Sequence, residues 1–316
     1  YKHFGVKTFQ AEDEISAITS ILGASFAGNL SVTASSGPGI ALKGEAIGLG
    51  VITELPIIII NVQRGGPSTG LPTKTEQSDL FQAMYGRNGD CPCVVIAANS
   101  PSDCFYTAIE AARIALKHMI PVMLLSDGYI ANGSEPWNIP DISKIKKIEN
   151  NLVSTSLEDY MPYKHDKTTL SRPWAVPGME GHEHRIGGLE KADNTGNVDY
   201  DPDNHDMMVR QRQKKVDIIA DFLPDVEIYG ETKGDLLVIS WGGVFGSVKS
   251  GVKKAQNEEL SVSHIHLRHL NPFPSNLGDC ILNFNKVLIP ELNMGHLRSI
   301  IRDKYLVDAK GLNQIA

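Results

Sequence analysis

The stretch that decides the fold is VTASSGPGIALKGEAIGLGVITELPIIIINVQRGGPSTGLPTKT, residues 32–75. Its pattern predicts a short strand, a glycine-rich turn at residues 35–39, a helix at about residues 40–53, a strand at residues 56–63 and a loop. The four isoleucines at residues 57–60 show no polar alternation, which is typical of a strand covered on both faces in a parallel sheet. The unit predicts an α/β fold, whose ligands bind beyond the carboxyl ends of the strands, here at SSGPG and QRGGPSTGLPT.

Length and composition narrow the class of protein. A chain of 316 residues is long enough for two α/β domains, and 41% hydrophobic with 21% charged residues predicts a soluble globular protein. The chain shows no signal peptide and no apolar run of about 18 residues, so we expect no membrane span. The net charge of −7 gives no reason to expect nucleic acid or an anionic membrane. Four scattered cysteines favour free thiols in a reducing cytoplasm over a disulfide framework.

Alternating strands and helices continue along the chain and predict two domains. A first α/β domain at residues 1–133 is followed by a proline-rich connection at residues 134–205, in which we expect one hairpin, and by a smaller α/β domain at residues 206–316. Further helices are expected at residues 11–23, 77–86, 100–117, 206–221, 244–256 and 293–302, and further strands at residues 93–98, 122–125, 235–240, 262–267, 286–289 and 305–308. Ser100 and Pro101 suit the start of the third of these helices, and the charges at residues 206–221 suggest a solvated face.

Several motifs of common functional sites are absent. SSGPG matches neither the phosphate-binding loop GxxxxGK[ST] nor a complete GxGxxG, and the nucleophile elbow GxSxG does not occur. His182 and His184 lack a third ligand at a suitable spacing, so we expect no metal site on this chain. At the first helix, Glu12, Asp13 and Glu14 have two interpretations that the sequence leaves open: capping of the helix amides, or chemistry.

Longer runs of sequence carry a more specific signal. QAEDEISAI, TASSGPG, VQRGGPSTGLPTK, QAMYGRNGD and SDGYIANG, followed by LLVISWG and VLIPELNMGHL, resemble the α subunit of 2-oxoacid:ferredoxin oxidoreductases, nearest to the 2-oxoglutarate branch. The resemblance spans nearly the whole chain. It implies an α/β fold with a parallel-sheet pyrimidine-binding domain of a thiamine diphosphate enzyme, followed by a domain like the C-terminal domain of transketolase.

The resemblance also implies a cofactor role for the first domain. Glu14 matches the glutamate that thiamine diphosphate enzymes direct at N1′ of the aminopyrimidine, where a carboxyl group favours the tautomer that removes the C2 proton. Glu12 and Asp13 then remain capping or surface groups. Ser36, Gly37 and Pro38 are expected to form the wall around the aminopyrimidine.

The substrate site is implied in the same way. Arg64 matches the family arginine that faces the 2-oxoacid carboxylate, which a guanidinium grips through two parallel hydrogen bonds. The alternative is a structural arginine paired with a carboxylate of its own loop. Ser68 and Thr69 are expected to add hydroxyl donors.

Two departures from the family pattern define the expected partners. The family segment YPITP lies upstream of the position of Tyr1, and the GDG motif that holds magnesium and diphosphate is absent, since Ser126-Asp127-Gly128 lacks the first glycine. The family carries Mg²⁺ and a 4Fe-4S cluster on a separate β subunit, so we expect this chain to be inactive alone, in an α2β2 or similar assembly. The chain is also expected to be a piece of a longer polypeptide. Whether that polypeptide carries a fused γ-like domain does not follow from the sequence.

The expected reaction converts 2-oxoglutarate and coenzyme A to succinyl-CoA and CO₂, with the electrons passing to ferredoxin. Pyruvate or a branched-chain 2-oxoacid is the alternative substrate. A non-catalytic scaffold subunit is the alternative from a different class of protein. The sequence alone does not place the coenzyme A site.

Overall fold

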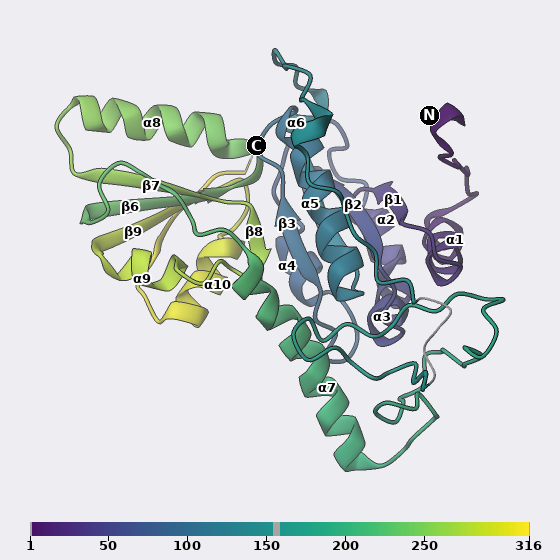
Figure 1. Ribbon diagram of the computed structural model, residues 1–316. Helices are drawn as coiled ribbons and strands as arrows, with labels where there is room; N and C mark the ends of the chain where they lie inside the picture. The colour runs from purple at the N-terminus through teal and green to yellow at the C-terminus, as the bar shows by residue number, and fades with distance from the viewer. Residues whose placement is uncertain (1, 154–158, 316) are drawn as a thin grey trace.

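A computed structural model describes residues 2–153 and 159–315 of the chain. Figure 1 shows two sheets side by side, each flanked by helices, with the long helix α7 (Pro202–Asp217) running obliquely from below the first domain to the junction between the sheets. None of the helices in these two described segments is long and apolar enough to cross a membrane.

The first sheet contains the strand–helix–strand unit that the sequence predicts. Its order is β1-β2-β4-β3-β8, with β1 to β4 parallel and β8 antiparallel to β3. Its strands are β1 (Ser31–Ser35), β2 (Ile57–Gln63), β3 (Val94–Ala97), β4 (Val122–Asp127) and β8 (His269–Asn271). Its helices are α1 (Glu14–Phe26), α2 (Gly37–Leu42), α3 (Gly44–Ile52), α4 (Leu80–Tyr85), α5 (Asp103–His118) and α6 (Gly128–Asn132).

The isoleucines of β2 confirm the prediction of a strand covered on both faces. Ile57 and Ile59 are fully buried in one hydrophobic cluster, with Ile18 of α1. Ile58 is buried in a second cluster on the other face, with Ala111 of α5. The carboxyl ends of the parallel strands therefore lie along one edge, between covering helices, where the predicted site residues follow β1 and β2.

The second sheet has the order β10-β9-β6-β7-β5, with β5 antiparallel to β7 and the remaining neighbours parallel. Its strands are β5 (Ile228–Tyr229), β6 (Gly234–Trp241), β7 (Val262–Leu267), β9 (Phe284–Glu291) and β10 (Lys310–Asn313). Helix α8 (Phe245–Asn257) covers one face, and α9 (Leu277–Leu282) and α10 (His296–Tyr305) cover the other (Figure 1). The α/β fold class is confirmed.

Several predicted elements differ from the structure. The helix expected at residues 40–53 is two helices, because the chain turns at Lys43, whose buried ammonium group reaches the main-chain oxygen of Glu14. Helix α5 begins at Asp103 and not at residue 100, because the preceding turn is held by hydrogen bonds to the carboxylates of Asp103 and Glu135. The strand expected at residues 305–308 is wrong, because α10 extends to Tyr305 and the last strand is β10.

The connection between the domains is anchored by buried charges. Lys215 and His165 both contact the carboxylate of Glu54, and the guanidinium of Arg172 donates to the main-chain oxygen of Thr53 at 3.0 Å. Burial alone raises the pKa of Glu54, but Lys215 and His165 outweigh burial and lower that pKa to about 2. The solvated face predicted for α7 is therefore wrong for Lys215. Short antiparallel pairing at residues 190–199 matches the expected hairpin.

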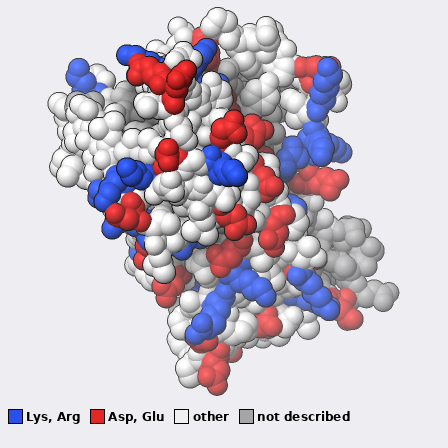
Figure 2. Space-filling view, turned by 90° about the vertical axis from the view of Figure 1, so that its left-hand side faces the viewer, with Lys and Arg blue, Asp and Glu red and all other residues white. Residues whose placement is uncertain are grey.

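Four short 3-10 helices complete the described structure: Lys2–Phe4, Ile142–Lys144, Ile218–Phe222 and Gly242–Val244. Helix α7 starts earlier than predicted because Pro202 occupies its first turn and the Asp201 carboxylate accepts from the amides of Asp203 and Asn204 at 2.9 and 3.0 Å. On the face shown in Figure 2, basic and acidic side chains of the described residues are interspersed.

Candidate active site

A cavity of about 800 Å³ lies where the carboxyl ends of β1 and β2 meet the second domain. From the first domain it is lined by Gly37 and Pro38, which follow β1, and by Arg64 and Ser68, which follow β2. These are four of the seven residues that the sequence singles out. Residues of the second domain close the other side of the cavity.

The loop that carries Arg64 is folded tightly on itself. The amide of Gly65 donates to the main-chain oxygen of Lys74 at 2.9 Å, and the amide of Leu71 donates to the oxygen of Gly65 at 2.8 Å. Gly70 has a φ of 47°, and a Cβ atom there would overlap the oxygen of Gly65. Glycine is therefore required at this position of the QRGGPSTG motif.

Arg64 is half-buried, and its guanidinium has no hydrogen-bond or ion-pair partner among residues 2–153 and 159–315. Its Nε atom is buried without a hydrogen-bond partner, and Arg64 takes part in none of the ion pairs among the described residues. The alternative of a structural arginine paired with its own loop is thus not realised. A buried donor without a partner costs free energy, which is expected where a ligand supplies the acceptor.

The two predicted substrate hydroxyls differ in their relation to the cavity. Ser68, with a φ of 55°, lines the cavity and the neighbouring Thr69 does not, although both residues are exposed. The roles assigned to both residues remain predictions.

The glycine-rich turn after β1 brings the start of α2 against α1. Ser36 occupies the N-cap position of α2 without a capping hydrogen bond from its side chain, and it does not line the cavity. A Cβ atom at Gly39 would overlap Oγ of Ser35 and lie 2.8 Å from Cγ of Glu14. The absence of a side chain at Gly39 thus makes the space that the side chain of Glu14 occupies.

Glu14 is the first residue of α1, but it does not cap the helix. The cap is Asp13, whose carboxylate accepts from the amide of Ser16 at 2.7 Å, which confirms the capping interpretation for Asp13. The Glu14 carboxylate forms no hydrogen bond or ion pair with other residues of the described segments. The ammonium group of the buried Lys43 donates to its main-chain oxygen at 3.2 Å. Burial lowers the pKa of Lys43, and the nearby Glu14 and Asp13 oppose that change.

Several other residues of the cavity were not predicted from sequence motifs. Asp79 receives a hydrogen bond from Nδ2 of Asn61 at 3.0 Å, and burial raises its pKa while the bonds from Asn61 and Ser78 oppose the rise. Gln82 and His296 also line the cavity. The segment ELNMGH, which contains His296, contributed to the family resemblance only as a sequence match.

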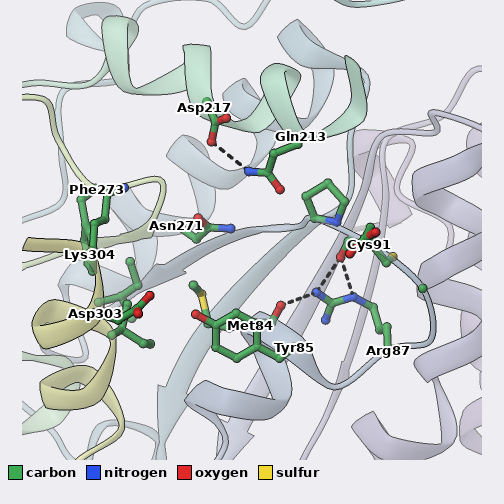
Figure 3. A pocket seen from close by; sticks show the side chains of 15 residues that line it. Met84, Tyr85, Arg87, Cys91, Gln213, Asp217, Asn271, Phe273, Asp303 and Lys304 are labelled. Atoms are coloured by element: carbon green, nitrogen blue, oxygen red, sulfur yellow. Dashed lines mark hydrogen bonds between the residues drawn. The ribbon is translucent and has the colours of Figure 1, made fainter. Parts of the chain in front are cut away.

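A second hollow, of about 430 Å³, lies between α4, α7 and α10 (Figure 3). Its Arg87 donates to the main-chain oxygens of Cys91 and Met84 at 2.9 Å, so its guanidinium is occupied in holding the turn after α4. Gln213 is bonded to Asp217 at 2.9 Å. None of the described side chains that line this second hollow has a buried polar atom without a partner. The cavity that Arg64 lines is therefore the better candidate for the active site. No three potential metal-ligating side chains cluster within residues 2–153 and 159–315.

Comparison with known proteins identifies the family. The family described as pyruvate flavodoxin/ferredoxin oxidoreductase, thiamine diphosphate-binding, matches residues 1–202. The chain is 53% identical over its full length to the 2-oxoglutarate oxidoreductase subunit KorA of Mycobacterium tuberculosis, of which it covers 48%. It is 34% identical to the 2-oxoglutarate synthase subunit KorA of Archaeoglobus fulgidus, with 93% of this chain and 77% of the relative covered. The chain thus spans about half the length of the first relative.

Solved structures agree with these relatives. A 2-oxoglutarate:ferredoxin oxidoreductase from Magnetococcus marinus, solved with 2-oxoglutarate, coenzyme A and succinyl-CoA bound, superimposes with a TM-score of 0.95 at 35% identity. The match covers the whole of this chain and 55% of that one. A split-gene transketolase at 12% identity and a TM-score of 0.51 shares the fold. The chain belongs to the thiamine diphosphate-binding family of pyruvate flavodoxin/ferredoxin oxidoreductases, among the 2-oxoacid:ferredoxin oxidoreductase α subunits, as its motifs predicted.

Proposed function

We propose that this chain is the α part of a thiamine diphosphate-dependent 2-oxoglutarate:ferredoxin oxidoreductase. The observation that carries the proposal is the guanidinium of Arg64, which has no partner in the part of the chain that the structure describes and belongs to a residue lining a cavity beside the glycine-rich turn. Because a guanidinium binds a carboxylate through two parallel hydrogen bonds, Arg64 holds the 2-oxoacid and fixes the direction of its keto carbon. Ser68 and Thr69 add hydroxyl donors at the same loop.

The residues around Glu14 fit the aminopyrimidine end of thiamine diphosphate. The carboxyl group of Glu14 has no partner in the described part of the chain, and Gly39 leaves it room. With thiamine diphosphate bound, Glu14 would share a proton with the N1′ nitrogen of the ring, and Ser36, Gly37 and Pro38 would form the adjoining wall. When bound, thiamine diphosphate supplies the carbon nucleophile and the electron sink for decarboxylation. The protein contributes an oriented acid and excludes water.

The remaining parts of the reaction require a partner. A β subunit carries Mg²⁺, the diphosphate site and a 4Fe-4S cluster, through which electrons leave to ferredoxin, and coenzyme A accepts the acyl group. This division is supported by the absence of the family's GDG motif from the sequence, where Ser126-Asp127-Gly128 stands instead, and by the word "subunit" in the names of the relatives. The assembly is α2β2 or similar and works in the cytoplasm. Within this chain we assign residues 1–133 to pyrimidine binding, residues 134–205 to the connection and residues 206–316 to the transketolase-like domain.

The names of the relatives support 2-oxoglutarate as the substrate. Both KorA relatives and the Magnetococcus marinus structure are named for 2-oxoglutarate. An Aeropyrum pernix relative at 32% identity is named more broadly, as a 2-oxoacid:ferredoxin oxidoreductase. Pyruvate and branched-chain 2-oxoacids are therefore the comparison substrates.

The test is reconstitution of the chain with its β subunit, Mg²⁺ and thiamine diphosphate. We expect reduction of ferredoxin that depends on coenzyme A and is faster with 2-oxoglutarate than with pyruvate or a branched-chain 2-oxoacid. A preference for either comparison substrate would reassign the specificity. An assembled, cofactor-loaded complex that oxidises none of these acids would instead support a scaffold subunit.

A further inference from the structure

The segment ELNMGH of the second domain, residues 291–296, has no role in the proposed function, yet its geometry is closely determined. The buried carboxylate of Glu291 accepts from the amides of Leu297 and Arg298 at 2.8 and 3.1 Å, at the first turn of α10. Oδ1 of Asn293 accepts from the amides of Gly295 and His296 at 2.6 and 2.9 Å. These bonds fix the main chain at His296.

The same segment is attached directly to the first domain. The fully buried Gln77 precedes α4, and its amide group bridges the domains: Nε2 donates to the oxygen of Trp241 at 2.6 Å, and Oε1 accepts from the amide of Leu292 at 3.0 Å. Nδ2 of Asn293 donates to the main-chain oxygen of Gln77 at 2.8 Å. The position of residue 296 relative to the first domain is therefore set by buried hydrogen bonds, and not by a flexible loop.

His296 lines the cavity that Arg64 also lines. It stacks on Phe81 of α4, with ring centroids 4.2 Å apart and an interplanar angle of 19°. Its Nδ1 atom is buried and has no hydrogen-bond partner. Nε of Arg64 and Oε1 of Gln82, which line the same cavity, are also buried without partners. Three such atoms around one space, from both domains, indicate a polar ligand that supplies their bonds.

We propose that His296 is a substrate-positioning residue, whose Nδ1 atom donates a hydrogen bond to an oxygen of the 2-oxoacid that Arg64 holds. This inference rests on the proposed function and adds the second domain to the substrate site. The cavity also contains the carboxylates of Glu76 and Asp79, which oppose the binding of an acid. A hydrogen bond donated by the ring of His296 compensates for part of this repulsion. Burial lowers the pKa of His296, and the nearby carboxylates of Glu291 and Asp79 oppose that change.

The test is the affinity of the assembled αβ complex for 2-oxoglutarate without thiamine diphosphate, so that the acid binds without reacting. His296→Phe keeps a ring on Phe81 but removes the donor, and we expect it to weaken binding about 10- to 100-fold, as for the loss of a hydrogen bond to a charged group. His296→Asn, whose amide reaches the place of Nδ1, should restore binding to within about 3-fold of the parent, whereas His296→Gln, whose amide reaches the place of Nε2, should not. Ser299→Ala, which removes a hydrogen bond within α10 outside the cavity, is the control.

The outcomes separate this inference from the proposed function. If the parent complex binds 2-oxoglutarate and His296→Phe binds it equally well, His296 is only a packing residue. If all three His296 variants lose binding to the same extent as well as thiamine diphosphate affinity, the ring holds the domains together and the positioning role is wrong. If the parent complex binds thiamine diphosphate but no 2-oxoacid, the proposed function itself fails.

Discussion

Replacing Glu14 by Gln should separate the catalytic role of this residue from any structural one. Glutamine matches glutamate in size, and the carboxylate it replaces has no hydrogen bond to the described residues, so no intramolecular bond is lost. The substitution does remove a favourable charge interaction with the ammonium group of Lys43, because Glu14 and Asp13 are the two acids that oppose the lowering of the Lys43 pKa. We expect the free energy of unfolding to change by no more than about 1 kcal/mol. Loss of acid–base assistance should instead slow activation by about 10²- to 10⁴-fold, or about 3–5.5 kcal/mol.

The assay is exchange of the C2 proton of thiamine diphosphate bound to the αβ complex, followed by NMR in deuterated buffer. Asp13→Ala is the matched control, because it removes the neighbouring carboxylate and the hydrogen bond to the amide of Ser16. It should cost about 1 kcal/mol of stability and leave exchange unchanged. Exchange in Glu14→Gln as fast as in the parent would refute the catalytic assignment.

Three further predictions follow from the site and the connection. Arg64→Lys in the αβ complex should lower kcat/KM for the 2-oxoacid about 10- to 1000-fold, or about 1.4–4 kcal/mol, because a point charge replaces the planar guanidinium; unchanged steady-state kinetics would make Arg64 structural. This chain alone should not bind thiamine diphosphate tightly in calorimetric titrations with Mg²⁺, because its sequence lacks the GDG motif that holds magnesium and diphosphate in the family, and tight binding would contradict a divided site. The pKa of the Glu54 carboxyl group is lowered from 4.5 to about 2 in the folded chain. The ionised carboxylate therefore adds to the free energy of unfolding above pH 4.5, and this stabilisation is lost as the pH falls toward 2. Urea denaturation of the parent should show a loss of about 3 kcal/mol in the free energy of unfolding over that pH range, and Glu54→Gln should not show this loss. Equal pH dependence of stability in the parent and the variant would refute the prediction.

The pattern of residues 32–75 predicted the central unit of the fold correctly because its signals are local. Four apolar β-branched residues in succession require cover on both faces of a strand, and the turn sequences place the ends of the elements. The second α/β unit was predicted in the same way. The strand β8 was not, because a three-residue segment has too little periodicity to be recognised and pairs with β3 only after the domains dock.

The candidate site also has a part that the sequence predicts and a part that it does not. Sequence motifs alone singled out Glu14, Arg64 and the glycine-rich turn, because each belongs to a short motif that can be recognised without a structure. Only the tertiary structure decided that Nε of Arg64 is buried without a partner among the described residues and that His296 lines the same cavity. More than 200 residues separate those two side chains, and the buried hydrogen bonds of Gln77 that bring their domains together depend on packing that no local pattern encodes.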